Sequence, residues 1–428
     1  MLDQGMPGNT FVKLKFRLIL LSFFQFFIWG SWLLTIGAYW FQNKQWSGTE
    51  FGAIFSTMGI AALFMPTLTG IWADRWIQAQ KLLGLFHCAA ACLFFCLPEM
   101  NQPSGFFWMM LAAMCFYMPT ISLANVVSFS ALKLKGMNVV EVFPSIRVWG
   151  TVGFVAATWF VSLLQAETSS VQFYIAGTAS LLLGVYAFTL PGCPANSDKV
   201  QQQSFLEFKF LKAFKDAGLR VFFFFAVLLG AALQLTNAYG DTFLHDFGKN
   251  EIYRDTFAVQ YPAVIMSLSQ ISETVFILTI PFMLRRFGIR NVMLFSIMAW
   301  VFRFALLAYA NPVSGLWMIL LSCIIYGIAF DFYNISGSLF VETQTDSSIR
   351  ASAQGLYMMM TNGLGALLGS LVSGVVIDRW FTNPDQSKNW QGIWLSFAGY
   401  ALVVLILFFI LFRDAKLKEP IENNPDFN

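Results

Sequence analysis

The sequence predicts an all-α integral membrane protein whose twelve transmembrane helices form two six-helix bundles. Hydrophobic residues make up 57% of the 428 residues and charged residues only 11%, whereas a soluble domain carries about 25% charged residues. Long apolar runs recur along the whole chain, each long enough to cross a ~30 Å hydrocarbon core. Lysine and arginine are concentrated in every second loop, and this pattern assigns each loop to the cytoplasmic or the outer side of the membrane.

The apolar runs are expected to be helices, because they are too long and too uniformly apolar for barrel strands. The first run is too long for a signal peptide and no A-x-A cleavage site follows it, which favours a retained first helix. The longest polar interruption predicts bundles at 1–190 and 219–428, joined by a linker at 191–218. The expected spans are 17–40, 51–73, 82–98, 106–130, 144–164, 171–190, 219–240, 260–284, 291–310, 315–340, 351–377 and 392–412.

The distribution of lysine and arginine predicts that both termini and the central linker are cytoplasmic. With that orientation the cytoplasmic segments hold nineteen basic residues and the outer loops hold five, in agreement with the positive-inside rule. The remaining two, Arg147 and Arg303, lie within spans. The net charge of +3 is small and gives no support for nucleic-acid binding, which needs a concentrated basic face.

Two acidic residues, Glu273 and Asp331, lie near the middle of their spans, whereas almost all others lie in loops or at span ends. A charged side chain at the bilayer centre costs at least ~2.5–3.5 kcal/mol on insertion scales. Neither acid has a basic residue on its own helix to neutralise it. We therefore expect a functional role for both, with the side chains facing a shared interior.

Other polar residues in the spans follow helical spacing, since residues three or four apart share a face. A Gln or Asn pair alone is often a contact between helices, and Arg147 alone could reach the cytoplasmic surface. Arg303 could pair with an acid or be structural, and His87 is expected to be a hydrogen-bonded interior residue. The polar faces comprise Arg147, Thr151 and Phe154; Gln234 and Asn237; Gln270 and Glu273; and Tyr326, Phe330 and Asn334 beside Asp331.

The sequence lacks the motifs of the main alternative classes. It contains no P-loop, G-x-S-x-G or H-E-x-x-H motif, so neither ATP-driven transport nor an integral membrane enzyme is favoured. Six cysteines and two histidines without a C-x-x-C pattern indicate no zinc site, disulfide framework or cofactor. A carboxylic acid buried between helices can hold a proton, which favours proton-coupled transport of a solute.

Gly70, Asp74 and Arg75 in "GIWADRW" follow the second span on the cytoplasmic side. Together with the six-plus-six layout, this turn resembles the G-x-x-x-D-R turn of the major facilitator superfamily, although the basic cluster that usually follows is absent. We expect a gating or structural role for it. "GVVIDRW" at 374–380 repeats the letters but lies on the outer side, and the positional counterpart is "RRFGIR" at 285–290.

Over essentially its whole length the chain resembles the nucleoside:proton symporter family, and within it the broad-specificity nucleoside permeases of bacteria. The segments that carry the resemblance include "FPSIRVWGTVGF", "LQLTNAYGDTFLH", "SQISETVFILTIPF" and "YGIAFDFYNISGSLFVE". The resemblance implies monomeric, proton-coupled uptake of purine and pyrimidine nucleosides across the bacterial inner membrane. It also implies a nucleoside site formed by Arg147, Thr151, Phe154, Gln234, Asn237, Gln270, Glu273, Tyr326, Phe330 and Asp331.

Two questions stay open within this resemblance. The coupling proton is expected on Asp331, with Glu273 as a ligand group or a second proton site. We expect the acids to accept hydrogen bonds from the ribose and the carboxamides to contact the base. A sugar:proton symporter on the same scaffold is the alternative function.

Overall fold

The structure is a computed structural model, and it describes residues 8–137, 139–192, 216–345, 353, 356–384 and 387–412. These residues are almost entirely helical, and they form no strand, only a bridge between Thr382 and Lys388. Nine of the helices described there are long and apolar enough to cross a membrane. The other three expected spans fall on α1 (Gly8–Gly30), α7 (Val171–Ala187) and α11 (Pro262–Ile277), so the all-α prediction is confirmed.

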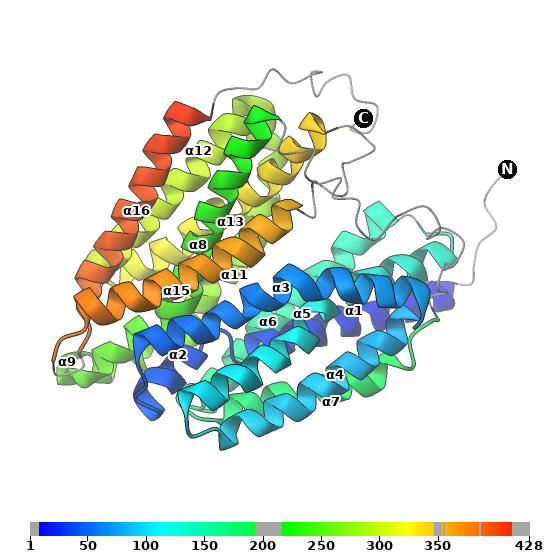
Figure 1. Ribbon diagram of the computed structural model, residues 1–428, viewed down its shortest axis with the longest axis horizontal. Coiled ribbons are helices and arrows are strands. Elements are labelled where there is room, and N and C mark those ends of the chain that lie inside the picture. Colours follow the sequence, from blue (N-terminus) through cyan, green and yellow to red (C-terminus); the bar gives the residue numbers. More distant parts are fainter. Residues whose placement is uncertain are drawn as a thin grey trace.

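The N-terminal half, residues 8–192, packs as one group of helices, with α1 against α6, α4 against α7, and α3 and α4 against α5 (Figure 1). Besides α1 and α7 it contains α2 (Ile36–Ala38), η1 (Tyr39–Asn43), α3 (Gly48–Arg75), α4 (Ala79–Cys96), η2 (Leu97–Glu99), α5 (Pro103–Leu134) and α6 (Val139–Leu163).

The C-terminal half, residues 216–412, packs α12 against α13 and α16, α11 against α13, and α15 against α8. Its elements besides α11 are α8 (Ala217–Asp246), η5 (Phe247–Lys249), α9 (Glu251–Arg254), α10 (Phe257–Gln260), α12 (Ile280–Tyr309), α13 (Leu316–Gln344), η6 (Met359–Gly365), α15 (Ala366–Val376), η7 (Ile377–Phe381) and α16 (Trp390–Leu411). Because 193–215 lie outside the described residues, the linker at 191–218 stays a prediction.

The eighth expected span is divided rather than continuous. Helix α11 ends at Ile277 and α12 begins at Ile280, with Pro281 in its first turn. Proline has no backbone N–H, so the helical hydrogen bonds of α11 cannot continue through it. Within α12, Gly288 has a φ of +74°, a conformation that glycine adopts readily. This bend lies in "RRFGIR", where the sequence predicted the turn between spans eight and nine.

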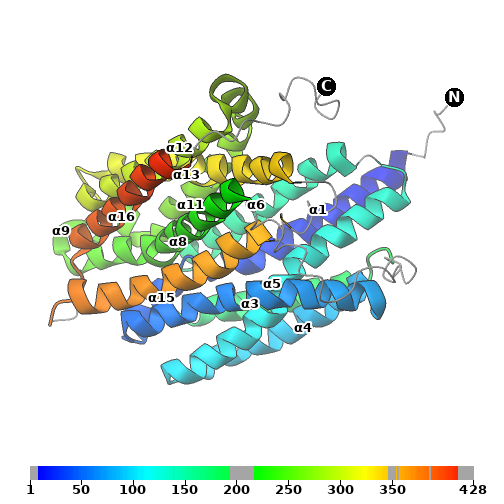
Figure 2. The ribbon, with the colours of Figure 1, turned by 45° about the horizontal axis from the view of Figure 1, so that its top comes forward.

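The two halves meet along α3 and α15, α6 and α11, and α2 and α8. Figures 1 and 2 show α3 beside α15 and the two groups of helices drawing together toward the end that carries α9, here called the α9 end. Figure 1 shows α2 at the same end. The approach of α3 to α15 is very close, because a Cβ atom added at Gly52 would lie 2.3 Å from the carbonyl oxygen of Ser370. A larger residue at Gly52 would therefore separate these two helices.

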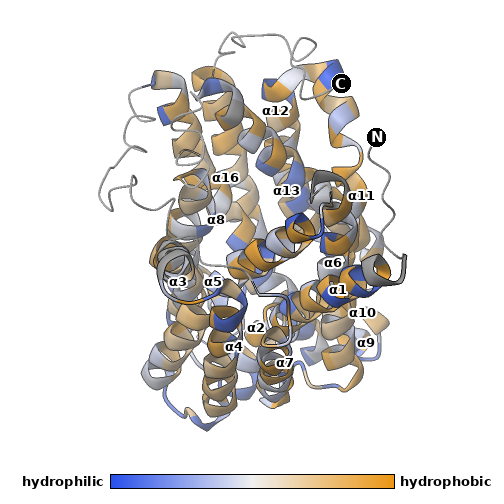
Figure 3. Ribbon diagram, turned by 90° about the vertical axis from the view of Figure 1, so that its right-hand side faces the viewer, coloured by the Kyte–Doolittle hydropathy of each residue, from blue (hydrophilic) through white to orange (hydrophobic). Residues whose placement is uncertain are grey.

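Hydrophobic residues predominate along the helices (Figure 3), and many of them are exposed. Large apolar side chains such as Phe64, Leu182 and Phe409 are more than half exposed. Soluble monomers rarely expose contiguous apolar patches of more than a few hundred Å². Together with the nine apolar spans, this surface identifies a multi-pass membrane protein.

Candidate functional site

Helix α6 carries the candidate site residues of the N-terminal half. Arg147 does not extend freely along the surface, because its guanidinium lies 4.0 Å from the ring centre of Phe26 on α1. Thr151 is half-buried and Phe154 is buried. The helix packs against α11 of the other half, so its polar face is directed toward the junction of the two halves.

Helix α13 carries both a candidate acid and a candidate aromatic platform. The rings of Tyr326 and Phe330 stack with centroids 5.9 Å apart and an interplanar angle of 13°. Asp331 is only 2% exposed, and its Oδ2 accepts no hydrogen bond within the described part of the chain. The Tyr357 hydroxyl donates to the backbone carbonyl oxygen of Asn334 at 3.3 Å and lies 3.5 Å from its side-chain Oδ1. Asn334 therefore already has a protein partner, whereas Oδ2 of Asp331 has none among the described residues.

The charged residues of α6, α11 and α13 interact across the junction. Glu273 interacts electrostatically with Arg147 of the N-terminal half and with Asp331 of α13. Tyr326 lies within interaction range of Gln270, Glu273 and Asp331. The structure thus brings together one guanidinium, two carboxyl groups and a phenol from three helices that are far apart in the sequence.

The carboxamides of α8 lie on a helix that packs against both α11 and α13. Gln234 is buried, and its Oε1 has no hydrogen-bond partner among the described residues, while Asn237 is half-buried. Buried polar atoms are normally hydrogen-bonded. The unpaired oxygens of Gln234 and Asp331 are therefore free to bind a polar ligand.

A serine on α11 connects the two helices that carry the candidate acids. The sequence did not predict this role. The Ser272 hydroxyl donates to the carbonyl oxygen of Ile324 at 2.5 Å and accepts from the Gly327 N–H at 3.3 Å. A Cβ at Gly327 would lie 2.7 Å from Ser272, so this contact requires glycine there. Ser272 precedes Glu273 and Gly327 follows Tyr326, so the contact fixes the register of these two site residues.

Arg303 on α12 supports the site without an acidic partner among the described ion pairs. It is fully buried, donates to the Ser322 carbonyl oxygen and to the Ser269 hydroxyl, and lies 4.7 Å from the ring centre of Tyr326. Of the two roles left open by the sequence, this geometry favours the structural one. The cation packs against the Tyr326 ring and helps to hold it in place.

His87 is hydrogen-bonded inside the N-terminal half, as the sequence analysis predicted. Its Nδ1 lies 3.1 Å from the Ser180 hydroxyl and its Nε2 lies 3.0 Å from Oε1 of Gln25. The residue is fully buried on α4, and both ring nitrogens have protein partners. It is therefore not a member of the site at the junction.

The acidic side chain of the second D-R segment is described by the structure, whereas that of the first is not. Gly70, Asp74 and Arg75 lie in the last turns of α3, but the side chains of Asp74 and Arg75 lie outside the described residues. In "GVVIDRW", the Asp378 carboxylate accepts from the N–H groups of Gly48 at 2.7 Å and Thr49 at 2.5 Å. It therefore joins the C-terminal half to the start of α3, a role that the sequence did not reveal.

One hollow of the structure is separate from the candidate site. It encloses about 370 Å³ among apolar and aromatic side chains of α1, α6 and α7, including Phe24, Phe27 and Phe160. None of the predicted site residues lines it. With no convergent polar groups, it lacks the features of a specific solute site, and the junction remains the candidate site.

Comparison with known proteins identifies the family. A model described as "Nucleoside H+ symporter" matches residues 12–417. The chain is 49% identical over 405 residues to a xanthosine permease of Escherichia coli, covering 94% of this chain and 96% of the relative. It is 45% identical over 412 residues to the nucleoside permease NupG of Escherichia coli, covering 96% and 98%.

The crystal structure of the nucleoside transporter NupG superimposes with a TM-score of 0.88 at 46% identity, covering 94% of this chain and 99% of that one. The resemblance drawn from the quoted segments is thereby confirmed, as is the transporter fold. The same findings assign the chain to transporters rather than enzymes. This protein belongs to the nucleoside H+ symporter family.

Proposed function

We propose that this protein is a proton-coupled symporter that imports purine and pyrimidine nucleosides across the bacterial inner membrane by alternating access. The observation that carries the proposal is the group of Arg147, Glu273 and Asp331 at the junction of the two halves, in a chain that belongs to the nucleoside H+ symporter family. Because these residues come from both halves, the distances between them change when the halves move relative to each other. We propose that the transporter acts as a monomer with both termini in the cytoplasm.

The site chemistry suits a neutral solute with a planar base and a hydroxylated sugar. Carboxylates accept hydrogen bonds from hydroxyl groups, and carboxamides both donate and accept, as the edge of a base requires. We assign the ribose to Glu273 and Asp331, and the base to Gln234, Asn237 and Gln270. Phe154, Thr151 and the stacked pair of Tyr326 and Phe330 would enclose the ligand, because aromatic faces stack favourably on planar rings.

We assign the coupling proton to Asp331, with Glu273 as a ligand group. A buried carboxylate is costly when no cation neutralises it, and protonation removes that cost. Glu273 has the cation Arg147 within interaction range, whereas Asp331 has the acid Glu273 within interaction range and has an unpaired oxygen. Binding a proton therefore lowers the energetic cost of burial more for Asp331 than for Glu273. We propose that Asp331 is protonated before the site becomes accessible from the other side of the membrane.

Contacts between the halves at the α9 end support an inward-facing state. Besides Asp378, the Trp159 indole donates to the Ser267 hydroxyl at 2.7 Å, and the Gln165 side chain donates to the Gln260 carbonyl oxygen at 3.2 Å. If the termini are cytoplasmic, this closed end faces the periplasm. We propose that these contacts break when the outer side opens, and that Gly70, Asp74 and Arg75 act in gating at the opposite end.

Transport by purified protein in proteoliposomes tests the proposal. With an imposed inward pH gradient, labelled uridine and adenosine should accumulate above their external concentration, and a protonophore should abolish the accumulation. A labelled disaccharide should not enter. Uptake of the disaccharide with no uptake of any nucleoside would instead establish the sugar symporter.

A preference for xanthosine is the second candidate, because a xanthosine permease is among the most similar relatives. Competition of unlabelled xanthosine with labelled uridine separates the two candidates. Half-maximal inhibition within about threefold of that by unlabelled uridine indicates a broad site. Inhibition by xanthosine at concentrations more than tenfold lower indicates a xanthosine-selective site.

A further inference from the structure

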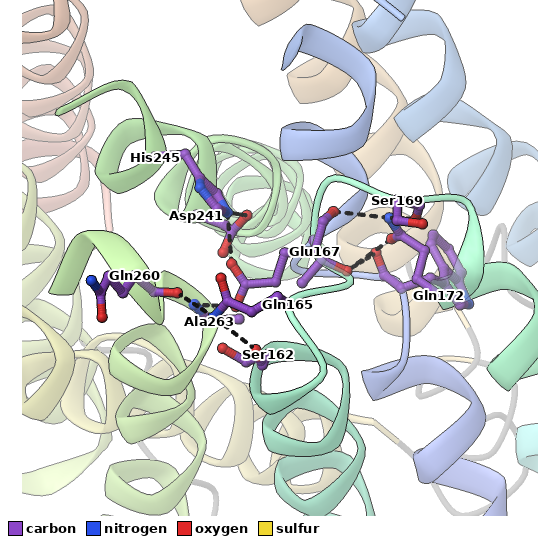
Figure 4. A network of polar contacts seen from close by, with 11 residues as sticks. Ser162, Gln165, Glu167, Ser169, Gln172, Asp241, His245, Gln260 and Ala263 are labelled. Atoms are coloured by element: carbon purple, nitrogen blue, oxygen red, sulfur yellow. Dashed lines mark hydrogen bonds and ion pairs between the residues drawn. The ribbon is translucent and has the colours of Figure 1, made fainter. Parts of the chain in front are cut away.

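We propose that Glu167, Asp241 and His245 form a binding site for a divalent transition-metal ion that bridges the two halves at the α9 end. Glu167 lies in the loop between α6 and α7, while Asp241 and His245 are spaced i, i+4 near the end of α8. Figure 4 shows the three side chains directed toward one another. Their ligand atoms all lie within 4.8 Å of one another.

The cluster contains two buried carboxyl groups and only one imidazole that can neutralise them. Asp241 is 1% exposed and Glu167 is 3% exposed, and a single imidazole lies between them. Neither carboxylate oxygen of Asp241 accepts a hydrogen bond in the described part of the chain, although Oδ2 lies 3.7 Å from Nε2 of His245. An unpaired, fully buried carboxylate directed into the cluster is suited to bind a cation, because buried charges are normally paired or coordinate metals.

The donor set fits zinc and chemically similar ions. Zinc is bound by imidazole nitrogen and carboxylate oxygen at about 2.0–2.2 Å, and sites with three protein ligands keep a fourth position for water. Ligand atoms around such an ion lie roughly 3–3.5 Å apart. The separation between Nε2 of His245 and Oδ2 of Asp241 is 3.7 Å and that to Oε2 of Glu167 is 2.6 Å. Small side-chain rotations would bring both into this range.

Neighbouring groups hold Glu167 in position. Its Oε1 accepts from the Ala263 N–H at 3.3 Å, and its backbone carbonyl oxygen accepts from the Gln172 side chain at 3.0 Å (Figure 4). Such supporting hydrogen bonds orient metal ligands. A hollow of about 300 Å³ that Glu167 and His245 line together with Arg254 and Asp255 provides an entry path.

A bound ion would favour one conformation of the transporter. Glu167 belongs to the N-terminal half, and Asp241 and His245 belong to the C-terminal half. An ion that binds all three binds only the state in which the α9 end is closed, and a ligand stabilises the state that it binds better. Zn²⁺ added on the side of the membrane that the α9 end faces should therefore slow transport.

Binding can be measured on the full-length protein without any substrate. Titration calorimetry and thermal unfolding in detergent should reveal one Zn²⁺ site and a Tm raised by several degrees at saturation, while Mg²⁺ should have little effect. His245→Ala and Asp241→Asn should each weaken Zn²⁺ binding at least about tenfold, because each removes one ligand. Glu251→Gln, which removes an exposed acid of the same end, should bind as the unmodified protein does.

A third variant and a transport readout keep the proposal testable if one substitution impairs folding. Glu167→Gln should weaken Zn²⁺ binding and relieve Zn²⁺ inhibition of transport, and a chelator should restore transport in the unmodified protein. Absence of Zn²⁺ binding would overturn the proposal. So would Zn²⁺ binding that all three substitutions leave unchanged, since the ion would then be bound elsewhere, for example by the cysteines.

Discussion

Replacing Asp378 with alanine should favour a state in which the α9 end is open. The Asp378 carboxylate accepts from the N–H groups of Gly48 and Thr49 at 2.7 and 2.5 Å. These are the first N–H groups of α3, which have no partner within the helix and lie at the positive end of its dipole. The substitution removes both hydrogen bonds between the halves and leaves no new charge.

The structure sets the size of the effect. Hydrogen bonds to a charged group contribute about 1.5–3 kcal/mol when buried, but Asp378 is only half-buried and Thr49 is exposed. We therefore expect the loss to resemble that of a helix cap, about 1–2 kcal/mol. Helix α3 keeps its own capping box of Ser47 and Glu50, so the loss affects the contact between halves and not the helix. This changes the ratio of the two states by roughly 5–30-fold.

Thiol modification measures this ratio. Thr242 is fully buried at the α9 end, beside Gly37 of the other half, so a cysteine there reacts only when that end opens. In a cysteine-free background, Thr242→Cys should react with an impermeant thiol reagent roughly 5–30-fold faster when combined with Asp378→Ala. Arg379→Ala, at the exposed neighbouring residue, should leave the rate unchanged. An unchanged rate in a folded Asp378→Ala variant would refute the reasoning.

Three further predictions concern packing and buried polar groups. Arg303→Ala should lower Tm by several degrees and weaken nucleoside binding, because it empties a buried space and releases the Tyr326 ring; an unchanged Tm and affinity would contradict this role. His87→Ala should cost about 1–3 kcal/mol of stability by leaving buried polar groups unpaired, yet preserve pH-driven accumulation; loss of accumulation in a folded variant would make His87 part of the proton path. Gly52→Ala should speed thiol modification at the α9 end because its Cβ would collide with α15, whereas Gly399→Ala, which has open space, should not.

The helices could be predicted from the sequence, and the two candidate site acids could be selected from it, for simple physical reasons. A membrane requires apolar runs of about 20 residues, so the spans are visible in composition alone. Charges within such runs are costly, so Glu273 and Asp331 stand out. Helical spacing then selects their neighbours, but it does not show that Asn334 already has the Tyr357 hydroxyl as a partner.

Contacts between distant residues could not be predicted in this way. Asp378 and Gly48 are 330 residues apart, and nothing in either segment indicates the other. The role of Ser272 could not be predicted, because serine is common in membrane helices and only its contact with Gly327 reveals this role. The cluster of Glu167, Asp241 and His245 also lacks the spacing of a known metal motif, since one ligand comes from a separate loop.

The most direct test of the central claim is the proton movement that accompanies nucleoside uptake. Proteoliposomes containing an entrapped pH indicator receive uridine without an imposed gradient, and internal pH and labelled uridine are followed together. The unmodified protein and the control Glu251→Gln should acidify the lumen as uridine enters. Asp331→Asn, nearly isosteric but unable to release a proton, should exchange uridine without proton movement and without accumulation under a pH gradient. Uridine-driven acidification and accumulation by Asp331→Asn would contradict the account.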